Sequence, residues 1–314
     1  MAERPELASG TTMEQPAAPP TGLPRPPAAT PSRGSTTGAV LRLVRAENCV
    51  MAGVATLVGA GATGTTGTAG TTETAAVAGS VAAVMLVLAF GNVVNDLSDQ
   101  DSDRLGKPGR PLPSGRVSPP QASALAVALL VGAIGVTAVT APHQLAFLMA
   151  MAAVAALYSP FLKKVPLLGN AVFAAQCGAT LVFGARATGG VHRSTVAAAL
   201  LVAVGVLCVE VAKTVEDHDA DRAVGTRTVA HLVKAIHQPR LVGAFAATYI
   251  AVWALLWPTA RSPVLFALAA APAFPLLAFA ALPPGPRPPS ARVARFVVAS
   301  KCLWPLALVA LAGL

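Results

Sequence analysis

Long apolar runs alternate with short polar segments from residue 39 to the last residue of the chain. A helix needs about 20 mainly apolar residues to cross the hydrocarbon core of a bilayer, and most of these runs have that length. The pattern therefore predicts an all-α polytopic membrane protein, a bundle of nine transmembrane helices. The predicted spans are residues 39–61, 77–97, 121–140, 143–159, 167–186, 194–214, 241–257, 263–282 and 294–313. A weak Pro-His-Gln break precedes the short fourth run, which predicts a tight hairpin with the third.

The first 38 residues differ from the rest, since they contain eight prolines and show no apolar periodicity. Such a segment cannot bury enough apolar surface to fold. We expect a disordered, Pro-rich N-terminal tail, residues 1–38, followed by a transmembrane domain, residues 39–314. The tail is unlike a signal peptide, because it shows no basic start followed by an apolar core.

Composition narrows the classes of protein that the chain can belong to. Of its 314 residues, 54% are hydrophobic and 12% are charged, which is about half the charged share of an ordinary soluble domain. These values exclude a disordered protein, a disulfide scaffold and most soluble enzymes. The net charge of +9 comes from basic residues in short segments between apolar runs. We therefore expect an anionic lipid bilayer as the neighbour, and no nucleic acid.

The basic residues also predict an orientation. If the tail and the segments after the even-numbered predicted spans share one side, that side holds 20 of the 23 basic residues. The positive-inside rule then places the N-terminus and these segments in the cytoplasm, and the C-terminus outside. The excess of Arg over Lys, with abundant Ala, Gly and Pro, indicates a GC-rich bacterial gene. We expect the plasma membrane of a bacterium.

Nine of the 14 acidic residues fall in two short stretches, residues 95–103 and 210–221, which close the second and sixth predicted spans. Acids are disfavoured at the C-terminal end of a helix, because the helix macrodipole prefers cations there. Solvated helix ends are the plain alternative. The repetition of the pattern at two cytoplasmic ends favours a functional role instead.

Each acidic stretch places its polar side chains in a stripe, since residues four apart share a face of a helix. The stripes are Asn95, Asp99 and Asp103 in the first stretch, with Asp96 in support, and Lys213, Asp217 and Asp221 in the second. Stacked carboxylates repel one another unless a cation lies between them. Hard oxygen ligands without His or Cys favour Mg²⁺, which takes one or two carboxylates and completes its shell with phosphate and water.

Two such stripes facing each other can hold Mg²⁺ ions that bridge one diphosphate. Metal charge then stabilises the diphosphate as it leaves during ionisation of an allylic C–O bond. Basic residues flank both stretches: Lys107, Arg110, Arg116, Lys163, Lys164, Arg222 and Arg227. Topological charge alone explains these equally well, but Lys213 lies inside a stripe and is expected to contact the diphosphate. Residues 107–116, rich in Pro and Gly, predict an ordered turn that either covers the cytoplasmic mouth or only links two helices.

The motifs resemble those of one family. Asn95-Asp96, Asp99 and Asp103, followed by residues 110–115 (Arg-Pro-Leu-Pro-Ser-Gly), are similar to the first motif of the UbiA superfamily of intramembrane prenyltransferases. Lys213, Asp217 and Asp221, followed by Gly225 and Thr228, are similar to its second motif. Residues 45–48 (Arg-Ala-Glu-Asn) and Tyr158-Ser159 with Lys163 support the match. Within this superfamily, the chain is most similar to the archaeal-type branch, which resembles digeranylgeranylglyceryl phosphate synthase.

The resemblance implies a nine-helix bundle with a central cavity open to lipid, and a polyprenyl diphosphate whose head lies at the two Asp motifs. Metal would be held by Asn95, Asp96, Asp99, Asp103, Asp217 and Asp221. The diphosphate and the substrates would contact Lys213, Arg110, Lys163, Tyr158, Asn48 and Arg116. One departure is Thr214, which stands where many relatives have Asp and removes one possible metal ligand.

Three functions are compatible with these residues. The first is Mg²⁺-dependent transfer of the prenyl group to an aromatic or polar-lipid acceptor. The second is a terpene cyclase of the UbiA type, which ionises the same donor without an acceptor. The third is a transporter, which is disfavoured because the charges gather at one face of the membrane and not along the spans.

Overall fold

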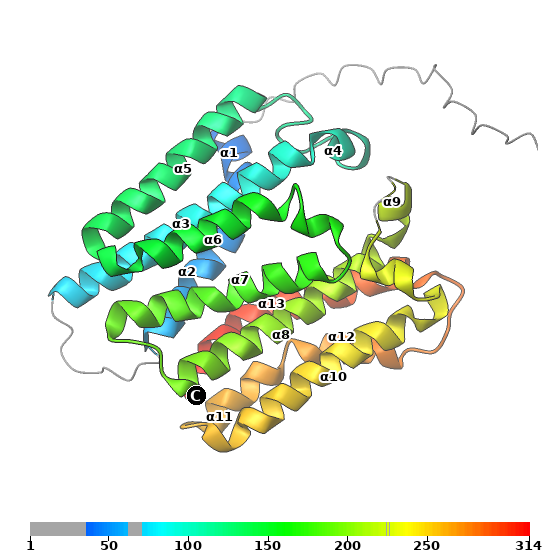
Figure 1. Ribbon diagram of the computed structural model, residues 1–314. Coiled ribbons are helices and arrows are strands. Elements are labelled where there is room, and N and C mark those ends of the chain that lie inside the picture. Colours follow the sequence, from blue (N-terminus) through cyan, green and yellow to red (C-terminus); the bar gives the residue numbers. More distant parts are fainter. Residues whose placement is uncertain (1–35, 62–70, 224, 226) are drawn as a thin grey trace, which may run out of the picture. The chain divides into compact units, whose positions relative to one another are not determined.

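The computed structural model describes residues 36–61, 71–223, 225 and 227–314, and these residues form helices and turns without a strand (Figure 1). The α-helices are α1 (Thr36–Val44), α2 (Ala46–Gly61), α3 (Thr71–Ser98), α4 (Gln100–Gly106), α5 (Pro119–Thr140), α6 (Leu145–Tyr158), α7 (Leu168–Ala185), α8 (Arg193–Glu216), α9 (His218–Ala223), α10 (Gln238–Leu256), α11 (Pro263–Ala267), α12 (Ala273–Ala281) and α13 (Pro289–Ala310). Short 3₁₀ turns are η1 (Pro142–Gln144), η2 (Leu162–Lys164), η3 (Arg186–Thr188), η4 (Val229–Leu232), η5 (Ala235–His237), η6 (Trp257–Thr259), η7 (Leu268–Ala270) and η8 (Leu311–Gly313). The predicted tail lies outside the described residues except for its last three, which begin α1.

Six of the described helices are long and apolar enough to cross a membrane, and eight spans result if each of two bent pairs counts as one. The bent pairs are α1 with α2 (48°) and the segments 263–270 with 273–281 (44°). The predicted span at 143–159 corresponds to a shorter apolar helix, Pro142–Tyr158. The chain is an integral membrane protein with six to eight candidate spans, and the number nine stays a prediction.

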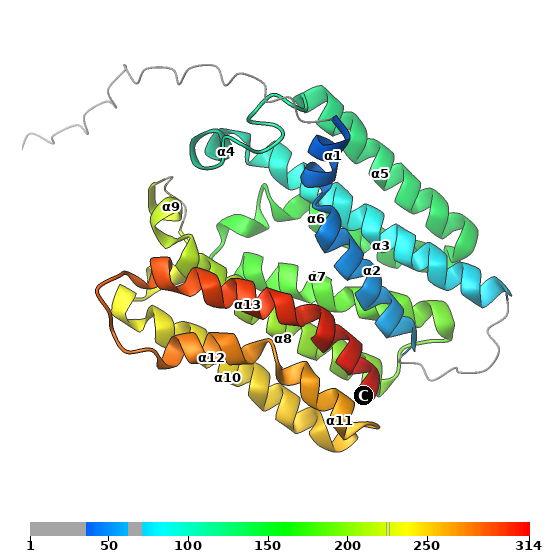
Figure 2. The same ribbon diagram turned by 180° about the vertical axis from the view of Figure 1, so that it is seen from behind.

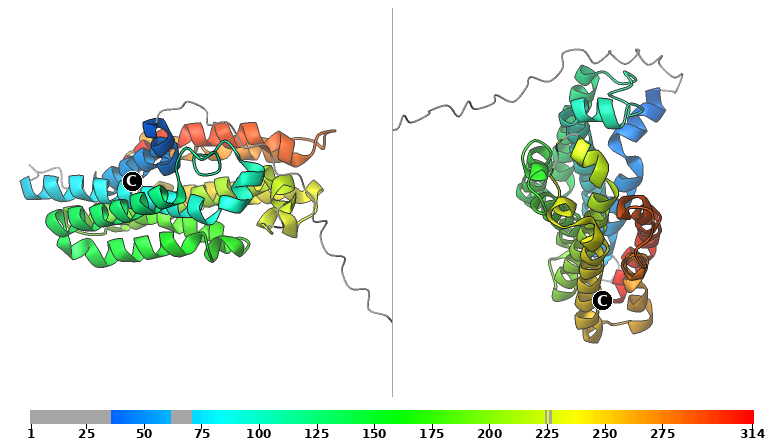
Figure 3. Two further views of the ribbon diagram at one scale, coloured as in Figure 1. Left: turned by 90° about the horizontal axis from the view of Figure 1, so that it is seen from above. Right: turned by 90° about the vertical axis from the view of Figure 1, so that its right-hand side faces the viewer.

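The helices pack in two groups that meet along α2 and α7. In the first group α3 packs against α2, α5 and α6, and in the second α8 packs against α7, α10 and α13. Buried apolar side chains form a large cluster around α8 and three smaller ones that each include residues of α3. Helices α6 and α7 lie on one face of the bundle, whereas α2 and α13 lie on the other (Figure 3).

The contact between α2 and α7 depends on small residues. A Cβ atom added at Gly59 of α2 would collide with the backbone of Leu181, and one added at Gly184 of α7 would collide with the backbone of Thr56. Close backbone approach at small residues is the usual way in which helices pack in lipid. The abundance of Gly and Ala in the apolar runs therefore has a packing role.

The first span is broken at Arg45, whose φ of 51° lies in the left-handed region. The break leaves the carbonyl of Val44 without its helical donor, and Asn92 of α3 replaces that donor through Nδ2 at 2.8 Å. The Oδ1 atom of Asn92 accepts a hydrogen bond from Arg45 Nη1 at 3.2 Å. The buried Asn92 amide therefore supplies the hydrogen bond that the Val44 carbonyl lacks at the helix break, and it directs the Arg45 side chain toward α3.

Candidate active site

The first acidic stretch continues α3 into α4 almost without interruption. The backbone amide of Asp99 donates to Asn95 (3.0 Å), and that of Asp103 donates to Asp99 (2.8 Å). The three residues of the stripe therefore follow one another at helical spacing across the end of α3.

The side chains of this stretch nevertheless divide between two faces. At 100° per residue, Asp96 and Asp103 are seven residues apart and differ in direction by only about 20°. Asp96 and Asp103 share Arg110 as a partner, and Asp96 also binds Arg45, whereas Asn95 and Asp99 contact the connection after α6. The carboxylate of Asp103 therefore groups with Asp96 and not with Asn95 and Asp99, the residues with which spacing four aligns it.

Asp96 and Asp103 are buried and bind arginines. Asp96 Oδ1 accepts from Arg45 Nη2 at 2.7 Å and lies 3.5 Å from Arg110 Nη1. The same Nη1 atom donates to Asp103 Oδ2 at 2.5 Å. Arg110 thus lies between two carboxylates, and both are neutralised by cations from other segments of the chain.

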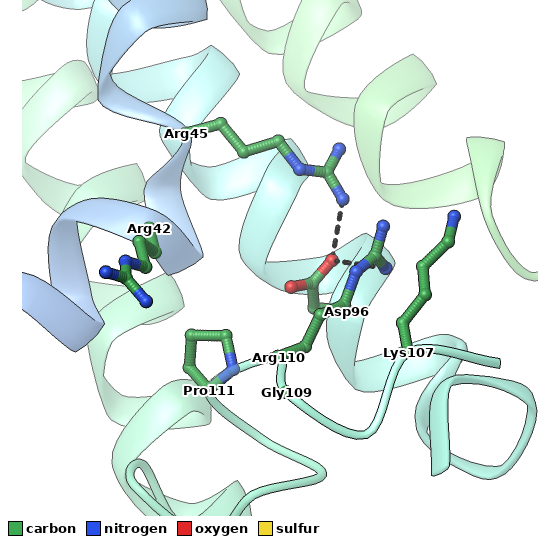
Figure 4. A pocket seen from close by; sticks show the side chains of 7 residues that line it. All are labelled: Arg42, Arg45, Asp96, Lys107, Gly109, Arg110 and Pro111. Atoms are coloured by element: carbon green, nitrogen blue, oxygen red, sulfur yellow. Dashed lines mark hydrogen bonds and ion pairs between the residues drawn. The ribbon is translucent and has the colours of Figure 1, made fainter. Parts of the chain in front are cut away.

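A pocket of about 370 Å³ opens beside this pair (Figure 4). Its lining residues are Arg42, Arg45, Asp96, Lys107, Gly109, Arg110 and Pro111. Four cationic side chains line it against one carboxylate, so the pocket retains an excess of positive charge. Figure 4 shows the carboxylate of Asp96 between Arg45 and Arg110, with Arg42 on the far side of the opening.

The second face of the stretch contacts the α6–α7 connection. Asn95 Oδ1 accepts from Ser159 Oγ at 2.7 Å, and Asp99 Oδ2 accepts from Lys163 Nζ at 2.5 Å. The Tyr158 hydroxyl interacts electrostatically with both Asp99 and Arg45. Asn95, Asp99, Tyr158 and Lys163 thus lie together, as the motif resemblance implies for a substrate site.

The second acidic stretch has a different environment. The backbone amide of Asp217 donates to Lys213, and that of Asp221 donates to Asp217, so this stripe also has helical spacing. The Lys213 ammonium, however, donates to Glu210 Oε1 at 2.7 Å and not to the aspartates. Burial, together with the neighbouring charge of Asp217, raises the pKa of Asp221 above its ordinary value.

Thr214 is buried, and its hydroxyl donates to the carbonyl of Val211 at 2.8 Å. The Thr214 hydroxyl is therefore hydrogen-bonded within its own helix. Position 214 therefore lies on the packed side of α8.

A histidine holds the turn that carries Asp217 and Asp221. His231 Nδ1 accepts from the backbone amide of Thr228 (3.2 Å), which assigns the hydrogen to Nε2, and Nε2 donates to the carbonyl of His218 (3.1 Å). The His218 and His231 rings stack with centroids 4.4 Å apart. At the other side of His218, the carboxylate of Asp219 is bound by His218 Nδ1 and Ser290 Oγ, which lowers the pKa of Asp219.

The two acidic stretches lie at the same end of the bundle, where α4 and α9 project (Figures 1 and 2). Electrostatics link them, because Lys163, which binds Asp99, also interacts with Asp221, as does Lys107. Lys163 therefore lies in the field of one carboxylate from each stretch.

The donor types fit a magnesium ion, since every candidate ligand is a carboxylate or amide oxygen. Within the described part of the chain, no three His, Cys, Asp or Glu side chains converge as a metal centre made by protein alone. Mg²⁺ that bridges a diphosphate needs only one or two carboxylates, because phosphate and water supply the other ligands. Asn95, Asp99, Asp217 and Asp221 have oxygen donors of this kind and would be the residues to hold such an ion.

Two predicted residues lie away from these contacts. Asn48 follows Arg45 in the first turn of α2 and is exposed, but it does not line the pocket. Arg116 binds Ser114 Oγ and the carbonyl of Gly109, so it braces the loop of residues 107–117. Arg42 was missed by sequence reasoning, and Arg45 was noted only as part of a motif. Two arginines three residues apart inside an apolar run are the signal that could have identified them.

Comparison with known proteins identifies the chain. The UbiA prenyltransferase family matches residues 52–301. The chain belongs to the UbiA prenyltransferase family. It is therefore an isoprenoid-processing membrane enzyme, a prenyltransferase, as its motifs predict.

Named relatives of this UbiA-family chain include archaeal enzymes. It is 34% identical to digeranylgeranylglyceryl phosphate synthase of Methanoculleus marisnigri over 62% of this chain and 68% of the relative. It is 31% identical to the enzyme of the same name from Natronomonas pharaonis over 73% and 78%.

Solved structures share the UbiA fold. A digeranylgeranylglyceryl phosphate synthase structure has a TM-score of 0.67 at 21% identity, and the match covers 88% of this chain and 97% of that one. A UbiA homologue from Archaeoglobus fulgidus bound to GPP and Mg²⁺ has a TM-score of 0.64 at 18% identity, covering 87% and 99%.

Proposed function

We propose that this UbiA-family enzyme transfers a prenyl group from a polyprenyl diphosphate to the hydroxyl group of a polar lipid that carries a phosphate. The observation that carries this proposal is the division of the first acidic stretch between two faces. One face meets the second stretch and suits the donor diphosphate, and the other supports a separate cationic pocket that suits a second anion.

On the donor face, we assign Mg²⁺ to Asn95, Asp99, Asp217 and Asp221, where it supplies positive charge to the leaving diphosphate. Lys163 binds Asp99 and interacts with Asp221, so its ammonium group is held where a diphosphate bound by both stretches would lie. Asp96 and Asp103 have another task in this proposal: they orient Arg45 and Arg110 through the ion pairs described above.

On the pocket face, Arg42, Arg45, Lys107 and Arg110 bind the acceptor phosphate. A volume of about 370 Å³ admits a glycerol phosphate headgroup, and four cations against one carboxylate favour an anion of two charges. The relatives named above synthesise a glyceryl phosphate lipid according to their names, which agrees with an acceptor of this class. The acceptor reacts from the cytoplasmic end if the orientation predicted from the basic residues holds.

The first test is product analysis. Purified protein in nanodiscs is incubated with Mg²⁺ and geranylgeranyl diphosphate, with and without a monoalkyl glycerol phosphate. We expect a prenyl ether only when the acceptor is present. A cyclic hydrocarbon or terpene alcohol formed without acceptor would instead make the protein a cyclase.

The second test separates the two anion sites. Arg42→Ala should raise the KM for the phosphorylated acceptor by about 10-fold and leave the KM for the donor unchanged, because a charge-assisted hydrogen bond contributes about 1.5–3 kcal/mol. The matched control is the same acceptor without its phosphate. This compound should be a poor substrate for the wild type, and Arg42→Ala should not reduce its turnover further. A rise in the donor KM would mean that the pocket holds the diphosphate.

A further inference from the structure

Glu210 is a carboxylate in a membrane-spanning helix. It lies in α8 seven residues before Asp217, which at 1.5 Å per residue places it about 10 Å deeper along the helix axis. Its side chain is only 16% exposed. An ionisable group at such a position is expensive to bury and usually serves a function, with a partner that can be named.

Four helices contribute polar groups around this carboxylate. Lys213, on the same face of α8, donates to Oε1 at 2.7 Å. Tyr158 of α6, Cys177 of α7 and Lys301 of α13 each interact with Glu210 electrostatically. Two ammonium groups, those of Lys213 and Lys301, therefore place positive charge beside Glu210 inside an apolar bundle.

The second oxygen of Glu210 is open. Among the described residues no donor reaches Oε2, although the first oxygen is bound by Lys213. The carboxylates of the first acidic stretch differ in this respect, since Asp96, Asp99 and Asp103 each accept a hydrogen bond from an arginine or lysine. Glu210 is also linked to the first stretch, because Tyr158 interacts electrostatically with both Glu210 and Asp99.

Prenyl transfer to a hydroxyl group releases a proton that has to be taken up. The C–O bond of the allylic diphosphate breaks, and the electron pair leaves with the diphosphate. A lone pair of the acceptor oxygen forms the new C–O bond, and the O–H bond then breaks while its electrons stay on oxygen. The proton needs a base beside the allylic carbon, which lies on the apolar side of the diphosphate.

We propose that Glu210 is the catalytic base that accepts this proton on Oε2. The inference rests on the proposed function, since a cyclase would have no acceptor hydroxyl. Lys213 and Lys301 place positive charge beside this carboxylate. The proton on the oxygen of the newly formed ether is very acidic, so it transfers readily to a carboxylate oxygen.

The competing role for Glu210 is to neutralise Lys213 and Lys301 without touching the substrate. Glu210→Gln separates the two, because it keeps the shape of the side chain and removes the base. Two rates are measured in nanodiscs with Mg²⁺, geranylgeranyl diphosphate and a monoalkyl glycerol phosphate. One is ether formation, and the other is ionisation of the donor, followed by the exchange of ¹⁸O between bridging and non-bridging positions of recovered donor.

For Glu210→Gln we expect ether formation to fall by about 100-fold or more, as for loss of a general base, while isotope exchange stays within about 3-fold of the wild type. Glu210→Asp retains a carboxylate and should recover part of the ether rate. Glu73→Gln, at the opposite end of α3, is the matched control and should retain both rates.

Equal loss of both rates would overturn the proposal, since Glu210 would then act in binding or ionisation. An unchanged ether rate would overturn it as well. If Glu210→Gln does not elute as a monodisperse species, Glu210→Asp is used alone. Its rate of ether formation is then compared with that of a Lys213→Met variant. A lower rate for Glu210→Asp than for Lys213→Met would contradict the role of Glu210 as the base. A wild type that releases diphosphate and never forms an ether would show that the proposed function itself is wrong.

Discussion

The two acidic stretches look alike in the sequence but differ in how their charges are balanced. In the first, Asp96, Asp99 and Asp103 each bind an arginine or a lysine that comes from another part of the chain. In the second, burial and the neighbouring charge of Asp217 raise the pKa of Asp221, and the nearby lysine, Lys213, binds Glu210 instead. Among the described residues, Asp217 and Asp221 form no ion pair, and Lys163 and Lys107 interact with Asp221 only at longer range.

The comparison shows that two stretches with similar sequences can have different roles. A buried ion pair adds little net stability, yet removal of one partner leaves a charge without compensation. We therefore expect substitutions of Asp96 and Asp103 to affect folding and substrate recognition, and substitutions of Asp217 and Asp221 to affect metal binding. The following predictions test that difference.

The largest effect should follow Asp217→Asn. It removes a carboxylate charge that has no ion pair among the described residues, and we expect turnover to fall by at least about 100-fold, the scale of a lost electrostatic contact in a transition state. Asp101→Asn is the matched control, because the Asp101 side chain is 97% exposed and pairs only with Arg104. Activity is measured as ether formation at saturating Mg²⁺, and equal losses in both variants would contradict the assignment.

Arg110→Gln should destabilise the fold. Asp103 loses its cation while buried, and we expect a loss of about 2–3 kcal/mol, somewhat less than for a fully buried pair because Arg110 is 27% exposed. The measurement is thermal unfolding in detergent. Asp103→Asn added to Arg110→Gln should recover part of the loss, and Arg104→Gln, at an exposed pair, should change stability by less than about 0.5 kcal/mol. No recovery in the double variant would mean that Arg110 acts by packing.

His231→Ala should weaken the second stretch alone. Without its hydrogen bonds to Thr228 and His218, the turn that carries Asp217 and Asp221 is less ordered. We expect about 10-fold more Mg²⁺ for half-maximal activity, similar to the loss of an outer-shell partner in other metal sites. His231→Gln retains an N–H donor and should restore part of the affinity. A changed acceptor KM with unchanged Mg²⁺ dependence would contradict this prediction.

The smallest effect concerns pH. Because the pKa of Asp221 is raised, the group protonates at a higher pH than an ordinary aspartate, and activity should fall as pH decreases through that value. Metal binding competes with the proton, so saturating Mg²⁺ should move this acid limb to lower pH. The measurement is the pH profile of kcat/KM at low and high Mg²⁺. An acid limb that does not move would exclude Asp221 as its origin.

Much of the fold could be predicted from apolar runs alone, because lipid forces each run to satisfy its backbone within a helix. What periodicity missed is the bending of two spans, at Arg45 and between residues 270 and 273. A break depends on a distant residue, such as Asn92, which supplies the donor that Val44 loses. The sequence around position 45 does not predict that Asn92 is the partner.

For the site, spacing predicted which residues gather but not which cation meets which carboxylate. Lys213 illustrates the limit: its position in the stripe implied a diphosphate contact, whereas Glu210, one turn earlier, binds it. The cationic pocket combines α1, the break after it and a loop more than 60 residues later, so only the tertiary fold could assemble it.

The ion pairs that hold Arg45 and Arg110 have a consequence for inhibitor design. These cations are positioned by Asp96 and Asp103 without any metal, so an anionic compound aimed at the pocket should bind with equal affinity in the presence and absence of Mg²⁺. Under the proposed function, a diphosphate mimic aimed at the other face would need the metal, so the Mg²⁺ dependence of binding would tell the two kinds of compound apart.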